Sequence, residues 1–251
     1  MNLPKRKLQF LAQSIGLLYL SDDIDSGQWD WDNYYQAAGI IKIPEGQMVK
    51  LDISSKALLS DVTNVFKSLE CDAIQELVIT GKQFNNSILN SISNLTELIR
   101  LRFVITSIDN LEDLNLSNLN KLLELTFLFT QIGCIGMLKI INVKKLEFLC
   151  LSGCNLCNDC LIHLKDLIYL KHLSLRLNNI SDEGVLHLVK LTHLHFLDLS
   201  GTQISDDGLM SLVTLSHLQE LLLESTFISN KGVDNFKTYL PKCNVYLKPS
   251  K

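Results

Sequence analysis

A Leu-x-Leu motif recurs along most of the chain at a fixed interval. Its first leucine is Leu77, and the same register returns every 24 residues to Leu221 and then to Val245. An earlier and looser match, Val-Lys-Leu-Asp-Ile, places Leu51 one interval of 26 residues before this series. A register held over so many intervals predicts a repeat array rather than a conventional domain.

Each repeat predicts a strand, a turn and a short helix. In residues 197–215, LDLSGTQISDDGLMSLVTL, the first leucines alternate with other residues, as in a strand. From Leu209 to Leu215 the leucines fall three apart, which is typical of a short helix or 3₁₀ turn. Between them, Ser205 suits a helix N-cap, and the two aspartates after it suit the positive end of the helix dipole.

One repeat alone cannot bury its apolar side, but stacked repeats share a continuous core. The predicted fold class is α/β. We expect a solenoid, a right-handed curved horseshoe with a parallel sheet on its concave face and short helices on its convex face.

Small residues that can form hydrogen bonds follow each predicted strand. The column is Thr106, Thr130, Cys154, Asn178, Thr202 and Thr226. Here the chain leaves the sheet, so we expect these side chains to satisfy buried backbone groups, each worth about 1–3 kcal/mol if left unmet. We therefore expect Thr202→Val to cost more stability than Ser200→Ala, because the alternation places Ser200 on the surface.

The repeat is missing from residues 1–48, which predict an N-terminal helical cap. We expect a helix near residues 5–20 and packing of Trp29 and Trp31 over the first repeat. A repeat stack needs such a lid, because its terminal unit otherwise exposes core.

Residues 49–251 form the predicted repeat domain, with a C-terminal cap from about residue 236. Val245 and Leu247 supply a last strand, and Pro249 prevents its extension.

The repeats resemble the leucine-rich-repeat superfamily, specifically its 24-residue bacterial-type units with T-x-I-S-D-x-G-L, which are related to the cysteine-containing, GALA and ribonuclease-inhibitor-like groups. The resemblance covers residues 49–248 and is strongest in KHLSLRLNNISDEGVLHLVKL and HFLDLSGTQISDDGLMSLVTL. TSIDNLEDL has lost the S-D-x-G turn, and TQIGCIGML keeps its Gly. The resemblance implies protein binding, and many bacterial relatives are effectors inside host cells or intracellular adaptors.

Composition narrows the classes of partner. The net charge of −4 and pI near 5.9 argue against nucleic acid as a general partner. The longest apolar stretch, residues 8–20, is too short to span a bilayer. The basic start is followed by no small-residue cleavage site, so we expect a cytoplasmic monomer without membrane contact, unless it is exported into a host cell.

Four of the seven cysteines gather in CLSGCNLCNDC, as Cys150, Cys154, Cys157 and Cys160, with His163 close behind. Such thiolates can bind zinc or an iron–sulfur cluster. The repeat register leaves at most Cys157, Cys160 and His163 on one side of the chain. We therefore expect reduced thiols and no metal or other cofactor, with a metal or redox centre kept as an alternative.

Catalytic patterns are absent from the sequence. We find no Ser-His-Asp arrangement, no phosphate-binding Gly loop and no H-E-x-x-H. His163 and His187, like His193 and His217, are 24 residues apart, which favours stacked surface histidines over a catalytic site. We expect that the chain is not an enzyme.

The predicted binding site is the concave face, because its residues vary from repeat to repeat while the leucines do not. The candidate partner-binding residues are Arg100, Arg102, Phe148, His172, Arg176, Phe196, Asp198, Glu220 and Tyr246. Aromatic and Arg side chains of this kind are favoured at interface hot spots.

The predicted function is that of a non-catalytic protein-binding module, as an effector or adaptor. One alternative is an enzyme inhibitor of the ribonuclease-inhibitor kind, which would have a more acidic inner face. The other is a substrate-recognition subunit of a ubiquitin ligase, although residues 1–48 contain no F-box pattern.

Overall fold

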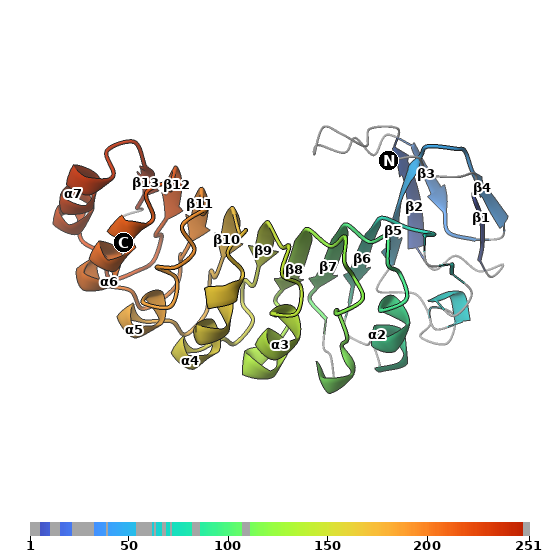
Figure 1. Cartoon of the computed structure of the whole chain (residues 1–251), viewed down its shortest axis with the longest axis horizontal. Coiled ribbons are helices and arrows are strands. Elements are labelled where there is room, and N and C mark those ends of the chain that lie inside the picture. The colour runs from blue at the N-terminus through green and yellow to red at the C-terminus, as the bar shows by residue number, and fades with distance from the viewer. Residues whose placement is uncertain are drawn as a thin grey trace. The chain divides into compact units, whose positions relative to one another are not determined.

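A computed structural model of the chain describes residues 6–10, 16–21, 33–38, 40–53, 62, 64–66, 69–70, 72–81, 86–106 and 111–247. The chain divides into two compact units, Met1–Leu122 and Leu123–Lys251 (Figure 1). Each unit is described by itself.

The first unit carries β-strands and short helices. Its elements are β1 (Arg6–Gln9), β2 (Gly16–Ser21), β3 (Asn33–Gln36), β4 (Ile40–Ile43), β5 (Met48–Ile53), β6 (Glu76–Thr80), α2 (Asn86–Ile92), β7 (Arg100–Val104) and the 3₁₀ helix η1 (Leu111–Asp113). Strands β5, β6 and β7 are parallel, and they align Leu51, Leu77 and Leu101. The predicted register of the first repeats is therefore confirmed, including the looser match at Leu51.

The predicted helix near residues 5–20 is wrong. The described residues of this segment form β1 and β2, and β2 pairs antiparallel with both β5 and β3. In β2, Leu18 and Leu20 are buried while Leu17 and Tyr19 are half-buried, a period of two that suits a strand. Hydrogen bonds to β5 extend the sheet of the first unit, whereas a helix would leave that edge unpaired. Trp29 and Trp31 lie outside the described residues.

The second unit repeats strand and helix in chain order. Its elements are β8 (Glu124–Leu128), α3 (Gly133–Ile140), β9 (Phe148–Cys150), α4 (Asn158–Leu161), η2 (Ile162–Asp166), β10 (His172–Ser174), α5 (Asp182–Val185), β11 (Phe196–Asp198), α6 (Asp206–Ser211), η3 (Leu212–Thr214), β12 (Glu220–Leu222), α7 (Asn230–Tyr239) and β13 (Asn244–Tyr246). The six strands lie side by side as a parallel sheet, and the helices lie on the opposite side (Figure 1). The predicted strand, turn and short helix are confirmed, as is a last strand at Val245; Pro249 lies outside the described residues.

The core of the second unit is a stack of leucines. Leu149, Leu173 and Leu197 are paired in register across β9, β10 and β11 and are fully buried. Leu209 and Leu212 close the core from the helix side of their repeat and are also fully buried. Each such side chain stabilises the fold by about 1.5–3 kcal/mol.

The column of small polar residues has the predicted role. Thr202 is buried and its hydroxyl donates to the carbonyl of Leu199, and the Thr226 hydroxyl donates to Leu223. Asn178, also buried, accepts from the backbone N–H groups of both Cys154 and Leu156. The expectation that Ser200 lies on the surface is wrong, because Ser200 is fully buried and its hydroxyl accepts from the N–H of Glu224.

In each repeat, the residue just before the small polar residue takes left-handed backbone angles. Gly153 and Gly201 have φ values of 64° and 69°, and Phe129 and Leu177 have φ values of 50° and 55°. A Cβ on Gly153 would lie 2.5 Å from the Phe129 ring, and one on Gly201 would lie 2.6 Å from the Leu177 side chain. From Phe129 to Gly201, large and small residues therefore alternate at this position.

In the part of the chain that the structure describes, no helix is long and apolar enough to cross a membrane.

Candidate functional site

The strand face of the second unit is the surface formed by side chains that alternate with the buried leucines of β8–β13. Its residues are Glu124, Thr126, Phe148, Cys150, His172, Ser174, Phe196, Asp198, Glu220, Leu222, Asn244 and Tyr246. The parallel register aligns these residues in rows across neighbouring strands, so that a feature in one repeat lies next to its counterpart in the following repeat.

Three rings form a stacked ladder on this face. Phe148, His172 and Phe196 are the first residues of β9, β10 and β11 and are paired in register. The ring centroids of Phe148 and His172 are 5.9 Å apart, and those of His172 and Phe196 are 5.7 Å apart, with interplanar angles of 28° and 25°. None of the three is sealed from water: the two phenylalanines are half-buried and His172 is exposed.

The His172 imidazole of the ladder stays neutral to a lower pH than the imidazole of a histidine in water. Desolvation between the neighbouring side chains lowers the pKa of His172, and the positive potential of His195 acts in the same direction. Nearby carboxylates of Glu124 and Glu220 oppose this shift. The ladder is therefore an aromatic and largely uncharged strip bordered by acidic side chains.

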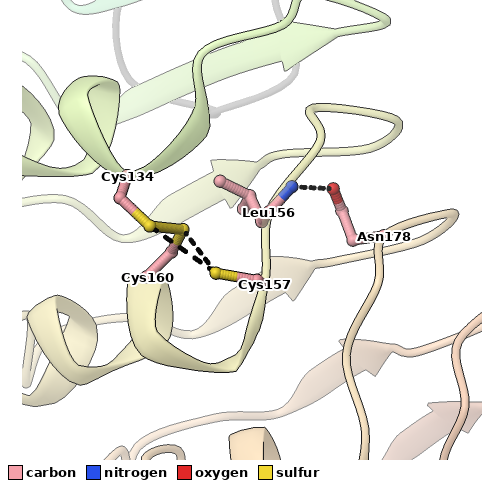
Figure 2. Close-up of a disulfide and its surroundings, with 5 residues drawn as sticks. All are labelled: Cys134, Leu156, Cys157, Cys160 and Asn178. Atoms are coloured by element: carbon pink, nitrogen blue, oxygen red, sulfur yellow. Dashed lines mark hydrogen bonds between the residues drawn. A yellow bond between two sulfur atoms is a disulfide. The ribbon is translucent and has the colours of Figure 1, made fainter.

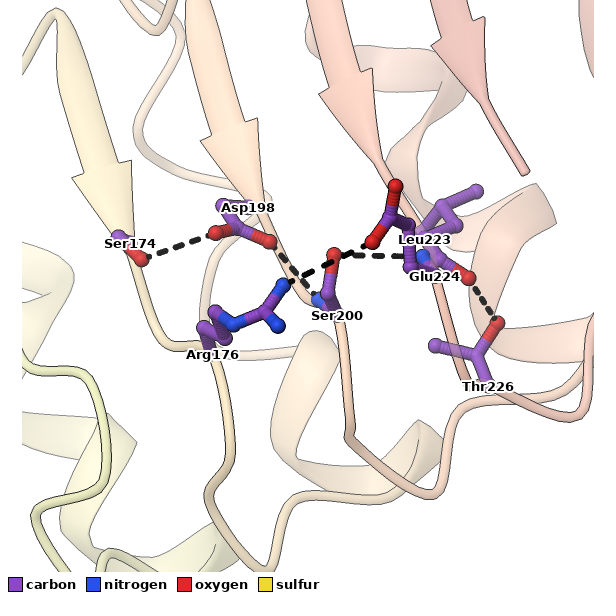
Figure 3. Close-up of polar contacts among 7 residues, drawn as sticks. All are labelled: Ser174, Arg176, Asp198, Ser200, Leu223, Glu224 and Thr226. Carbon is purple, nitrogen blue, oxygen red and sulfur yellow. Dashed lines mark hydrogen bonds and ion pairs between the residues drawn. The ribbon is translucent and has the colours of Figure 1, made fainter. Parts of the chain in front are cut away.

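Beside the ladder, the ends of β10–β12 carry a polar network (Figure 3). Asp198 accepts hydrogen bonds from the Ser174 hydroxyl at 3.3 Å and from the backbone N–H of Ser200 at 2.9 Å. Its residue is only 7% exposed, so the expectation that Asp198 is a free contact residue is wrong. The neighbouring strand β10 supplies Ser174, and the residues just after β11 supply the N–H of Ser200.

Arg176 and Glu224 form the outer part of this network. Their side chains make an ion pair at 3.9 Å across the neighbouring repeat, and both stay partly accessible. Glu220 and Tyr246, at the far end of the strand face, are exposed. The structure thus brings Arg176, Phe196 and Glu220 onto one continuous surface.

The two remaining candidates, Arg100 and Arg102, belong to the first unit. Both guanidinium groups lie 3.8 Å from the carboxylate of Glu76, which is buried and also faces Lys50 at 3.8 Å. Arg100 is 8% exposed, so the expectation that it points into solvent is wrong. Its charge faces the buried acid, whereas Arg102 is half-buried.

Two further residues of the strand-face border were not predicted from the sequence. Phe129 and Leu177 are 50% and 46% exposed, and their N–H groups continue the sheet ladder to the carbonyls of Ser152 and Ser200. Bulky apolar side chains are unusual at positive φ. The signal was present in the alignment of repeats, because the same column contains Gly153 and Gly201.

The cysteines form a different cluster from the predicted one (Figure 2). Cys134 and Cys160 are joined by a disulfide, so the expectation of reduced thiols is wrong for this pair. Sγ of Cys157 lies 3.5 Å from Sγ of Cys160 and 3.7 Å from Sγ of Cys134. Among the described residues, this three-cysteine group takes the place of the predicted Cys157, Cys160 and His163 set.

Cys134 was missed because it lies in TQIGCIGML, where the turn departs from the repeat pattern. Its distance of 26 residues from Cys160 is close to one repeat, which is the signal that could have paired them. Cys154 is not part of the group, because its thiol donates to the carbonyl of Phe127 in the core. Burial raises the pKa of Cys154 to about 12.

Surface histidines stack as the repeat register predicts for one of the two pairs. The rings of His193 and His217 are 6.4 Å apart and nearly parallel, and His195 lies 6.2 Å from His217 at a tilt. The ring Nδ1 atoms of His195 and His217 contact backbone carbonyls of His193 and Thr192. These contacts hold the imidazoles on the surface of neighbouring repeats.

Comparison with known proteins agrees with this architecture. A family model described as "Leucine Rich repeat" matches residues 166–189 and 190–213. No curated protein matches the chain. Among solved structures, internalin C2 of Listeria monocytogenes is similar, with 21% identity, a TM-score of 0.57, and coverage of 77% of this chain and 93% of that one.

Internalin F of the same organism is similar too, with 20% identity and a TM-score of 0.54. That match covers 80% of this chain, which spans 58% of the length of internalin F. At these identities the likeness shows the fold. The matched repeats, the strand-and-helix units and both structural likenesses show that this chain has a leucine-rich-repeat fold.

Proposed function

We propose that the chain is a non-catalytic module that binds a protein partner through the strand face of Leu123–Lys251. The observation that carries this proposal is the ladder of Phe148, His172 and Phe196, which is stacked and yet accessible. Aromatic side chains held rigid in advance lose little entropy on binding and supply most of the energy at many interfaces. Solenoid repeats commonly use such extended surfaces for binding.

The surroundings of the ladder fit the border of an interface. Arg176 and Glu224 lie along one side, and Glu220 and Tyr246 continue the face toward its end. Phe129 and Leu177 add exposed apolar surface at the strand ends. An apolar centre with a polar margin is the usual arrangement of protein–protein interfaces.

The mixed charge of this face favours a general protein partner over the inhibitor alternative. The face carries Arg176 as well as the acidic Glu124, Glu220 and Glu224, whereas an inhibitor of the ribonuclease-inhibitor kind would have a more uniformly acidic face. A role as substrate receptor of a ubiquitin ligase depends on residues 1–48 and is tested by measuring whether they bind a ligase adaptor.

The absence of catalysis is part of the proposal and has a physical support. Buried polar side chains of the repeats, such as Thr202, Asn178 and Ser200, form hydrogen bonds with the backbone. These side chains stabilise the turns between strand and helix. This structural role accounts for their burial without a catalytic one.

We further propose that the protein acts as a cytoplasmic monomer, or as an effector exported into a host cell, with neither nucleic acid nor membrane as partner. The net charge of −4 supports the exclusion of nucleic acid, because phosphate backbones are bound by basic surfaces. The effector or adaptor role rests on the resemblance of the repeats to bacterial-type leucine-rich repeats.

The test is affinity capture of partners, followed by mass spectrometry, with the wild-type chain and the double variant Phe196→Ala/Arg176→Ala. We expect the double variant to lose partners that the wild type captures, because it removes one rung of the ladder and one charge beside it. Its melting temperature should stay almost unchanged, because Phe196 lies at the surface and is not part of the buried core, and an exposed ion pair contributes about 0–1 kcal/mol.

The matched control is Leu186→Ala/Lys190→Ala, which removes an exposed apolar side chain and a cation from the helix side. This variant should capture the same partners as the wild type. If the strand-face variant keeps its partners while the helix-side variant loses them, the binding surface is on the helix side and the proposal is wrong.

A further inference from the structure

We propose that Cys134, Cys157 and Cys160 form a thiolate site for Zn²⁺ when the Cys134–Cys160 disulfide is reduced, and that the disulfide is the closed, metal-free state of the same site. The proposal is independent of partner binding at the strand face. It concerns two successive repeats at the start of the second unit.

The three sulfur atoms converge from two repeats. Cys134 lies in α3, Cys157 is the N-cap residue of α4, and Cys160 lies within α4. All three Sγ atoms lie within 4.8 Å of one another. Stacking of the repeats therefore brings together three cysteines that lie up to 26 residues apart in the sequence.

The separations of the sulfur atoms match those of a zinc thiolate centre. With Zn–S bonds of about 2.3 Å and tetrahedral angles, sulfur atoms lie about 3.8 Å apart. Cys157 Sγ is already 3.5 and 3.7 Å from the other two sulfur atoms. Reduction lets Cys134 and Cys160 separate to a nonbonded distance, which completes a triangle of similar sides.

The position of Cys157 favours a shared ligand over disulfide exchange. Exchange needs the attacking sulfur on the extension of the bond that breaks, with the leaving sulfur at the far end. Cys157 Sγ is instead almost equidistant from the two bonded sulfur atoms, and so lies beside the bond. A cation within the triangle can contact all three sulfur atoms at once.

The Cys157 loop is held in place by the next repeat rather than by the disulfide. Cys157 forms a parallel bridge with Asn179. The side chain of Asn158 accepts from the N–H of Ser181 at 2.9 Å and donates to its hydroxyl at 2.8 Å. These contacts persist when the disulfide is reduced, so the site keeps much of its geometry without metal.

Cations can reach the group from solvent. Cys157 lines an open polar hollow together with Asp159 and Glu183, whose carboxylates give it an acidic margin. Three thiolates leave one of the four tetrahedral positions for water or another small ligand. Zn²⁺ is the favoured ion, because thiolates are its preferred ligands and hard cations such as Mg²⁺ prefer oxygen.

The change between the two states is a balanced redox step. Two equivalents of a low-molecular-weight thiol transfer two electrons and two protons to Sγ of Cys134 and Cys160, and the thiol is itself oxidised to its disulfide. Zn²⁺ then replaces the three thiol protons, which pass to the solvent. A reducing compartment would therefore favour the zinc form, and an oxidising one the disulfide.

The experiment titrates the full chain with ZnSO₄ after reduction with a phosphine and its anaerobic removal, in competition with a colorimetric chelator. Native mass spectrometry counts the bound ions. We expect one Zn²⁺ per reduced wild-type chain and none on the oxidised chain. Cys157→Ser should weaken binding roughly tenfold or more, since loss of even an outer-shell partner costs that much at metal sites.

Cys157→Ser leaves the disulfide and its fold intact in the oxidised state, so its melting temperature separates lost binding from lost structure. The matched control is Cys150→Ser, a half-buried cysteine of β9 that contacts Ser152 and should leave zinc binding unchanged. The proposal is overturned if the reduced wild-type chain binds no zinc, or if Cys157→Ser binds it as tightly as the wild type.

Discussion

Asp182 of one repeat is bound to Ser205 of the next. The Asp182 carboxylate accepts from the Ser205 N–H at 2.8 Å and from the Ser205 hydroxyl at 2.6 Å. The same pair recurs one repeat later as Asp206 and Ser229. The Ser-Asp of the repeat motif therefore joins neighbouring repeats, while Ser205 also caps α6 by accepting from the N–H of Asp207, as the sequence predicts.

This relationship predicts that Asp182→Ala costs more stability than Glu183→Ala. Both acids lie in the first turn of α5, so both variants lose a similar interaction with the helix dipole. Asp182→Ala also removes the acceptor of two hydrogen bonds, and should lower the free energy of unfolding by about 1–3 kcal/mol more. Urea unfolding measures the difference; equal midpoints would show that the bonds across the repeat contribute nothing.

Gly208→Ala should destabilise the protein although alanine is the better helix former by about 1 kcal/mol. A Cβ at Gly208 would lie 2.1 Å from Oδ1 of Asp182, so the carboxylate must leave Ser205. The penalty should therefore shrink in an Asp182→Ala background. A double-mutant cycle by urea unfolding measures this coupling, and strictly additive effects would contradict the proposed cause.

Asn178→Ala should be among the most damaging single substitutions in the second unit. Its amide accepts from the N–H groups of Cys154 and Leu156 and donates to the carbonyl of Leu151. Because each buried group left unmet costs about 1–3 kcal/mol, we expect a loss above about 2 kcal/mol. Asn179→Ala is the control, because Asn179 is exposed and should change the melting temperature little.

Stability should fall with acidity through His172. Its pKa in the folded chain is lowered, chiefly by desolvation between the neighbouring side chains, so on acidification the unfolded chain takes up this proton first. Stability is therefore lost as the pH falls through the ordinary histidine value of about 6.5. His172→Phe keeps a ring in the ladder and should show a shallower loss between about pH 7 and pH 5.5. Parallel pH profiles of the unfolding midpoint would contradict this assignment.

The sequence predicts the repeat architecture because the information is local. A period of two in Leu197 and Leu199, and a period of three from Leu209 to Leu215, indicate strand and helix within a single unit. The polar column at Asn178 and Thr202 is likewise visible in the register, because every repeat leaves its sheet at the same point. The strand-face position of Phe148, His172 and Phe196 follows from the same alternation.

What the sequence alone could not decide depends on contacts between repeats or between distant segments. The segment predicted as a helix near residues 5–20 becomes strand in its described part because β5 offers an edge to pair with. Asp198 and Ser200 are buried because neighbouring strands cover them, which alternation within one strand cannot reveal. Cys134 reaches Cys157 and Cys160 because the repeats stack at a fixed spacing. Periodicity determines which side of a repeat a residue occupies, and tertiary packing decides what covers it.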